Sequence, residues 1–278
     1  MENKIKIGIC DWALPPLGPY LCKIAADFKL DGLYLDFGSY SDGFHLSYEV
    51  VQRAYLEASD RWGIELHAIA MNDLCINGIT SSSDFKKREI AKNTIISCIK
   101  SAEALKVPIV YFPSMFNSDI ENEEDFQLTV DGFKQACRYA EDKGIVVCTE
   151  NLLSAEDNLR LLNQVDCKNL KILFDTQNPY YQKGFYVPDM IRKLKDNILE
   201  VHVKDGQDQG LSSSLLGKGK TDFYESIKAF KEINYSGWLT LENYYFKEPL
   251  RNLNDNPFEL LKQDTEILKD ALEKEHMR

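Results

Sequence analysis

The chain switches eight times between a short apolar run of β-type composition and a longer connecting stretch. The clearest helical connections carry apolar residues at i, i+3 and i+4 spacing with charges on the opposite face; they are 48–62, 83–105, 123–143 and 223–233. Runs such as IKIGIC are continuously apolar, as expected for parallel strands buried on both faces. The expected strands are 4–10, 32–37, 65–71, 108–112, 145–150, 171–175, 198–203 and 238–242.

Eight such units in 278 residues fit one closed barrel better than an open doubly wound sheet, which commonly needs fewer strands. No GxGxxG follows the first expected strand, which weakens a dinucleotide-binding interpretation. We therefore expect an α/β fold, a (β/α)8 TIM barrel, with residues 1–278 forming a single domain.

The charge and the cysteines exclude several classes of protein. A net charge of −11 without a local Lys/Arg cluster argues against a nucleic-acid partner. No run of 18 apolar residues occurs and the first ten residues lack an apolar signal core, so we expect a cytoplasmic protein with no membrane partner. The seven cysteines are scattered without CxxC spacing, which predicts buried, reduced thiols.

Four of the expected strands end on a side chain that can bind a metal: Glu150, Asp175, His202 and Glu242. Since the carboxyl ends of parallel barrel strands open on one face, these four side chains can converge. Three carboxylates without an ion would repel one another. Oxygen ligands with one imidazole suit a divalent metal ion, with Mn²⁺ as first choice and Mg²⁺, Co²⁺ or Zn²⁺ as alternatives.

Five segments carry a family resemblance: TENLLS (149–154), FDTQNP (174–179), EVHVKDG (200–206), LLGKGKTDF (215–223) and LTLENYY (239–245). Together they resemble the sugar phosphate isomerase/epimerase family of xylose-isomerase-like TIM barrels, which includes ketose 3-epimerases, hydroxypyruvate isomerases and inosose isomerases. The resemblance implies one divalent ion on the four strand-end residues and a small-molecule sugar substrate. It also implies that Glu150 and Glu242 are the acid/base pair of an epimerase.

An ion that bridges the carbonyl and hydroxyl oxygens of a ketose stabilises an enediolate and makes proton removal feasible at neutral pH. Epimerisation needs a base on each face of the carbon, whereas isomerisation needs one base that moves the proton to the neighbouring carbon. The sequence predicts such a sugar epimerase or isomerase. Three alternatives stay open: hydroxypyruvate isomerisation, an inosose-type dehydratase, and a non-catalytic sugar-binding barrel. A related multi-metal DNA-repair nuclease is disfavoured, because the chain has only four histidines and is acidic.

Three features near the expected ligands bear on the substrate. Many family members carry a histidine three residues after the metal-binding aspartate, and this chain has Asn178 there, which can hydrogen-bond a hydroxyl but cannot titrate near neutrality. Lys204 either neutralises an enediolate or pairs with a neighbouring acid. The Gly217–Lys220 turn is either a phosphate-binding loop or a solvated one.

Other polar and aromatic residues are expected at strand ends. Trp12 either stacks on a sugar or packs the barrel mouth. Asn72, Ser114 and Asn151 are candidate hydroxyl-binding residues, with turn formation as the alternative. The aromatic segments 180–186 and 244–246 have three interpretations. They form a lid, they make a subunit contact in a homo-oligomer, or they pack the loops over the barrel.

Overall fold

The computed structural model describes residues 5–79, 85–207 and 210–278. Its eight strands are parallel and close in sequence order into a barrel, which confirms the expected TIM-barrel fold. The strands are β1 (Lys6–Cys10), β2 (Gly32–Asp36), β3 (Glu65–Ala70), β4 (Ile109–Ser114), β5 (Val146–Asn151), β6 (Leu170–Asp175), β7 (Ile198–Val203) and β8 (Trp238–Leu241).

The four helices that the periodicity predicts most clearly all form, and they are among nine helices in the described residues. The nine are α1 (Leu21–Asp27), α2 (Glu49–Trp62), α3 (Phe85–Leu105), α4 (Glu123–Glu141), α5 (Ala155–Val165), α6 (Asn178–Lys183), α7 (Val187–Leu194), α8 (Phe223–Glu232) and α9 (Pro257–Lys274). The predicted start of α3 at residues 83–84 lies outside the described residues.

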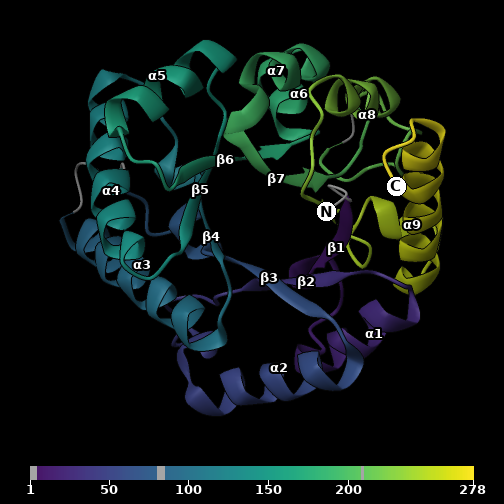
Figure 1. Cartoon of the computed structure of the whole chain (residues 1–278), viewed down its shortest axis with the longest axis horizontal. Coiled ribbons are helices and arrows are strands. Elements are labelled where there is room, and N and C mark those ends of the chain that lie inside the picture. Colours follow the sequence, from purple (N-terminus) through teal and green to yellow (C-terminus); the bar gives the residue numbers. More distant parts are fainter. Residues whose placement is uncertain (1–4, 80–84, 208–209) are drawn as a thin grey trace. The chain divides into compact units, whose positions relative to one another are not determined.

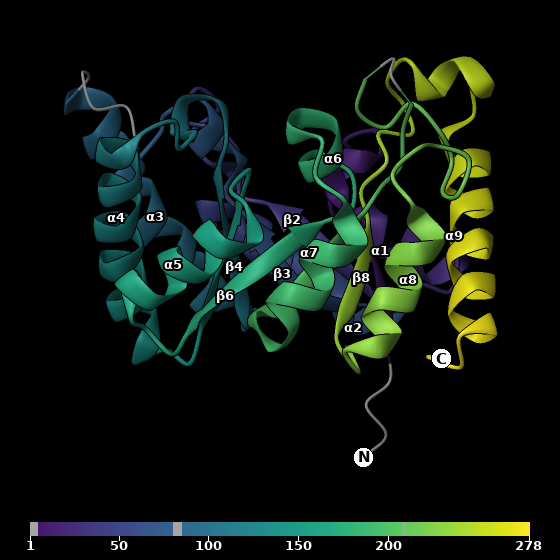
Figure 2. The ribbon, with the colours of Figure 1, turned by 90° about the horizontal axis from the view of Figure 1, so that it is seen from above.

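The chain divides into two compact units, of which the first comprises Met1–Leu33 and Phe174–Arg278. Within it β8 pairs with both β1 and β7, so that Leu239 lies in register with Ile7 and Val201. Helices α8 and α9 pack side by side (Figure 2). Helix α9 begins at the Asn256 N-cap, whose side chain accepts a hydrogen bond from the Phe258 N–H, with Pro257 at the first helical position.

The second unit comprises Tyr34–Leu173 and contains the β3–β4–β5 part of the sheet with the start of β6. Helices α3 and α4 lie against each other there (Figure 1). Asn122 caps α4 and Ser154 caps α5 through side-chain acceptors, while α2 ends on Gly63 with a positive φ of 66°. The caps and the glycine fix where each helix begins or ends, and so where the strand-end residues emerge.

The cysteines and the hydropathy of the helices bear on two of the predictions from composition. None of the seven cysteines, all of which the structure describes, forms a disulfide; five are buried, and Cys75 and Cys167 are half-buried. None of the helices in the described part of the chain has both the length and the apolar character needed to cross a membrane.

Candidate metal centre

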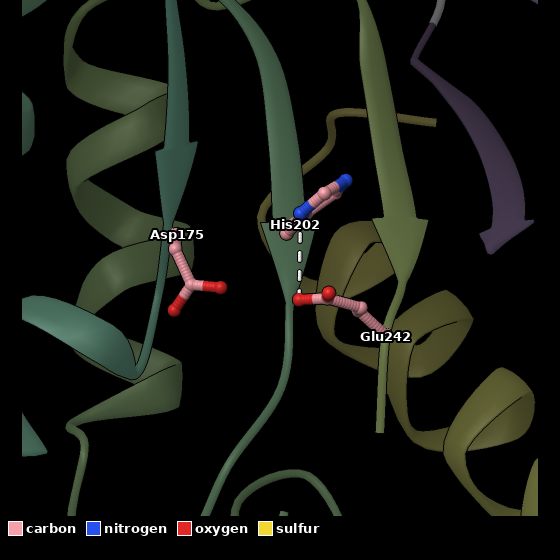
Figure 3. Close-up of side chains that lie close together, drawn as sticks. All are labelled: Asp175, His202 and Glu242. Carbon is pink, nitrogen blue, oxygen red and sulfur yellow. Dashed lines mark ion pairs between the residues drawn. The ribbon is translucent and has the colours of Figure 1, made fainter. Parts of the chain in front are cut away.

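Three of the four predicted metal ligands come together in the first unit. Asp175 ends β6, His202 lies in β7, and Glu242 follows β8 directly, and their side chains lie close together (Figure 3). One ligand atom from each residue lies within 4.8 Å of the others, and all three residues are buried. Two carboxylates and an imidazole at this separation fit a divalent ion of the Mn²⁺, Mg²⁺, Co²⁺ or Zn²⁺ type.

The carboxylate of Asp175 is oriented by the backbone that follows it. Its Oδ1 accepts hydrogen bonds from the N–H groups of Gln177 at 2.7 Å and Asn178 at 2.6 Å. These donors are the N-cap residue and the first residue of α6, so the start of the short helix holds the aspartate by N–H groups that have no partner within the helix. The backbone of Asn178 thus serves the site, whereas the predicted contact of its side chain with a substrate hydroxyl stays a prediction.

Glu242 is held by contacts at both carboxylate oxygens. Its Oε1 accepts a hydrogen bond from Trp12 Nε1 at 2.9 Å. Its Oε2 accepts one from Lys204 Nζ at 2.6 Å and lies 3.4 Å from His202 Nδ1. Burial alone would raise the pKa of Glu242, but the charges of Lys204 and His202 outweigh it and hold that pKa well below its ordinary value. The glutamate is therefore ionised at neutral pH.

Lys204 is fully buried between two of the predicted ligands. Its Nζ lies 2.9 Å from Asp175 Oδ2 and 2.6 Å from Glu242 Oε2. Its backbone is fixed by Thr176, whose hydroxyl accepts from the Lys204 N–H at 3.0 Å and donates to the Lys204 carbonyl at 2.8 Å. The structure therefore agrees with the interpretation that Lys204 pairs with acids, and the acids are those of the candidate metal centre.

Trp12 contributes packing and one hydrogen bond to the centre. It lies in a 3₁₀ turn, Asp11–Ala13, directly after β1. Besides the bond to Glu242, its ring meets that of His202 edge to face, with centroids 5.8 Å apart. Trp12 thereby restricts both ligand side chains, and stacking on a substrate stays a prediction.

The remaining predicted site residues lie in the second unit. Glu150 is the second-to-last residue of β5 and is buried. Its Oε2 accepts a hydrogen bond from the Tyr111 hydroxyl at 2.5 Å. The side-chain amide of Asn151 donates a hydrogen bond to Asn158 Oδ1 at 2.9 Å, and its oxygen accepts one from the Leu153 N–H at 3.0 Å, as in turn formation. The membership of Glu150 in the metal centre stays a prediction.

Asn72 and Ser114 are the other two predicted hydroxyl-binding residues of the second unit. The amide of Asn72 donates to Asp36 Oδ1 at 3.0 Å. Ser114 is the last residue of β4 and is fully buried. A substrate contact for either side chain stays a prediction.

The glycine- and lysine-containing turn at 217–220 uses its backbone donors inside the protein. The N–H groups of Gly217 and Gly219 donate to Asp205 Oδ2 at 2.9 and 3.0 Å. Lys218 and Lys220 are exposed. Because the carboxylate already takes these N–H groups, a phosphate has no free backbone cradle at these two residues.

Sequence reasoning did not predict a buried polar group that extends behind the site. It contains Gln177, Asp205, Asn243 and Asp264, all buried, the last of them on α9. A signal for Asp264 was present, because it is an acid on the same helix face as the buried residues Leu260, Leu261 and Leu268. For Asn243 and Asp205 the signal was their position directly after Glu242 and Lys204.

Asp264 should make the stability of the protein depend on pH. Burial raises its pKa from 3.8 to about 7, so the folded protein binds a proton in this range that the unfolded chain has released. Its contribution to the free energy of unfolding is greatest at low pH and falls as the pH rises from about 4 to about 7, by at most about 1.4 kcal/mol per pH unit. Urea unfolding of the metal-free protein across this range, beside Asp264→Asn, should show a shallower decline in the variant, and parallel pH profiles would contradict the assignment.

Comparisons with known proteins agree with this architecture. Residues 22–271 match the family described as xylose isomerase-like TIM barrel. A 2-epi-5-epi-valiolone 7-phosphate 2-epimerase from Actinoplanes sp. is 27% identical over 228 residues, which cover 81% of this chain and 82% of the relative. An inosose dehydratase from Clostridium beijerinckii is 28% identical over 144 residues, 44% of this chain and 48% of the relative.

A solved structure described as L-ribulose 3-epimerase superposes with a TM-score of 0.81 over 98% of this chain and 96% of that one, at 17% identity. At this identity the likeness concerns the fold. The epimerase relatives belong to the isomerase class that the sequence predicts. With nearly the whole barrel matched, the chain belongs to the xylose isomerase-like TIM barrel family.

Proposed function

We propose that this protein is a divalent-metal-dependent epimerase or isomerase of a polyhydroxylated ketone, free or phosphorylated. The observation that carries the proposal is the buried Asp175–His202–Glu242 group with the ammonium of Lys204 against two of its carboxylates. A divalent ion, Mn²⁺ by first choice, would be held by these three residues with Glu150 as fourth ligand. When bound, it supplies a Lewis acid that polarises the carbonyl and lowers the energy of the enediolate.

The protein residues would then move one proton on carbon. Glu150 and Glu242 act as base and acid, one on each face of the reacting carbon in an epimerisation. The buried ammonium of Lys204 offsets the negative charge that develops as the proton leaves. Trp12, beside Glu242 and His202, limits the access of water on its side of the centre.

A dehydratase is the second candidate, favoured by the inosose dehydratases among the relatives. The same first proton transfer leads to loss of a β-hydroxyl if water departs before the carbon is reprotonated. The two reactions therefore share their residues and differ in product mass. A binding protein without turnover is the third alternative, and it predicts sugar binding without any exchange of carbon-bound hydrogen.

The test is turnover in D₂O by the Mn²⁺-loaded protein with a panel of ketoses, ketose phosphates and cyclic keto-polyols, followed by NMR and mass spectrometry. We expect deuterium at one carbon next to the carbonyl, in a product of substrate mass plus the incorporated isotope. A product that is lighter than the substrate by one water, about 18 mass units, would assign the dehydratase reaction instead. Absence of exchange with every member of the panel, despite stoichiometric metal, would refute proton-transfer chemistry on these substrates.

A further inference from the structure

The strand ends that carry Asp175, His202 and Glu242 are all fastened to one loop. This β7–α8 loop, 206–222, is described except for residues 208–209. Gln177, two residues after Asp175, accepts a hydrogen bond from the Ser212 N–H at 2.9 Å and donates to the Gly210 carbonyl at 3.3 Å. The exit of β6 is thereby tied to the middle of the loop.

The exit of β7 is tied to the end of the same loop by Asp205, which follows Lys204. Besides the two glycine N–H groups, its carboxylate accepts from the Thr221 hydroxyl at 2.7 Å and the Gly206 N–H at 2.8 Å. A Cβ at Gly219 would lie 2.0 Å from Asp205 Oδ1, so the loop can wrap the carboxylate only with glycine there. Asp205 therefore acts as the internal anion around which the loop folds.

The exit of β8 joins this group through Asn243, which follows Glu242. Its Oδ1 accepts from the Asp205 N–H at 3.2 Å, and its Nδ2 donates to the Ser214 carbonyl at 3.1 Å. The second hydrogen of that amide goes to Asp264 Oδ2 at 2.7 Å. Asn243 thus bridges the exits of β7 and β8, and its amide can make all these bonds in one orientation only.

Asp264 closes the group from the last helix, α9. It is fully buried, and both of its oxygens are engaged, Oδ1 by the Leu216 N–H at 2.8 Å and Oδ2 by Asn243 and the Tyr245 hydroxyl at 3.0 Å. Burying a carboxylate is costly unless every bond is made. An acid on this mostly apolar face needs an explanation, and its partners supply one, since each lies in a segment adjoining the candidate ligands.

We infer that Asp264 is a positioning residue of the metal centre, which, through Asn243 and the β7–α8 loop, sets where Glu242 lies relative to His202 and Lys204. The inference rests on the proposed metal-dependent function. Asp264 itself touches neither a ligand nor a reacting atom among the contacts described. Its effect on the centre is therefore indirect, through the direction in which the Glu242 backbone leaves β8.

The informative variant is Asp264→Asn, which keeps the size of the side chain. Its amide would place N–H donors against either the Leu216 N–H or the Asn243 amide, and turning Asn243 over would break its bonds to Asp205 and Ser214. Leu268→Ala is the matched control, because it removes a buried side chain one turn further along α9 and destabilises the fold without removing a hydrogen-bonding group.

Both variants and the wild type are titrated with Co²⁺, with affinity from calorimetry and coordination from the visible absorption spectrum. We expect Asp264→Asn to weaken binding by about 10- to 100-fold, the range typical of outer-shell partners, and to change the band shape. Leu268→Ala should lower the melting temperature yet keep affinity and spectrum. These readouts do not depend on turnover.

The outcomes separate the inference from the function it rests on. The positioning role alone would be overturned if Asp264→Asn kept the wild-type Co²⁺ affinity and absorption spectrum. The same holds if its affinity and spectrum matched those of Leu268→Ala. If Asp264→Asn weakens Co²⁺ binding and changes the spectrum as expected, but the wild-type protein exchanges no substrate proton, the positioning role is upheld and the proposed reaction is overturned. A wild type that binds no Co²⁺ would overturn both.

Discussion

Glu242→Gln should lower epimerisation by about 10³-fold or more at saturating Mn²⁺, in the upper part of the range that general acid–base groups contribute. The amide can still accept the Trp12 hydrogen bond at Oε1, but it cannot take a proton from carbon. The glutamine amide also places N–H groups toward the ammonium of Lys204, which in the wild-type protein donates to Glu242 Oε2 at 2.6 Å. Weaker metal binding must therefore be separated from lost chemistry, which is why activity is compared at saturation.

The same substitution at Glu150 distinguishes one base from two. If the glutamates serve opposite faces, Glu150→Gln and Glu242→Gln both lose epimerisation, yet each retains slow deuterium exchange into one epimer, and the two variants exchange different epimers. Quenched D₂O reactions that start from each epimer, analysed by NMR, report this directly. Substantial epimerisation by either variant would show that the acid/base pair is wrongly assigned.

Glu200→Gln provides the control for placing an amide inside the barrel. Glu200 is a fully buried glutamate of β7, and its Oε1 accepts a hydrogen bond from the Thr240 hydroxyl at 2.8 Å, which glutamine can also accept. It belongs to neither the candidate ligands nor the acid/base pair. A fall in turnover below about tenfold is expected, well short of the range for a lost acid–base group.

The fold could be predicted because its signals are local. A buried parallel strand needs a continuous apolar run and an amphipathic helix needs a 3.6-residue period, so each unit is recognised without knowledge of its neighbours. The ends of strands were predicted with similar success, and they place Asp175, His202 and Glu242 on a common face by the geometry of any barrel. The short helices α6 and α7 were not named, because they are too short for their period to stand out.

What could not be predicted depends on contacts between distant residues. The bond from Asn243 to Asp264 spans 21 positions and that from Asp205 to Asn243 spans 38, and no local pattern specifies such a pairing. The sequence also left open whether Lys204 neutralises an enediolate or pairs with a neighbouring acid. Its burial between Asp175 and Glu242 follows from packing of the β6, β7 and β8 exits, which single-residue chemistry does not reveal.

Lys204→Met should strengthen metal binding while it weakens turnover. A positive charge about 5 Å from a bound divalent cation costs roughly 7 kcal/mol at an effective dielectric constant near 20, most of which is recovered by relaxation of the protein. We therefore expect the Mn²⁺ affinity to rise by about tenfold. Turnover should fall by about 10²-fold or more, because the group that offsets the developing negative charge is gone.

The stability of the metal-free variant should change in the opposite sense from its affinity. Removing Lys204 leaves the buried carboxylates of Asp175 and Glu242 without their cation, a change that typically costs about 3–5 kcal/mol. Added Mn²⁺ should consequently raise the melting temperature of Lys204→Met by more than it raises that of the wild type. Calorimetry with and without chelator measures both effects on one sample.

Lys218→Met is the matched control for net charge, since Lys218 lies on the same β7–α8 loop with its side chain exposed. It should leave metal affinity and turnover near wild type, because a charge in water is screened from the centre. If Lys204→Met instead bound Mn²⁺ more weakly, the ammonium would support the ion, for example by holding the two carboxylates in place. In that case its pairing with Asp175 and Glu242 would have to be understood as organising the ligands rather than competing with the metal.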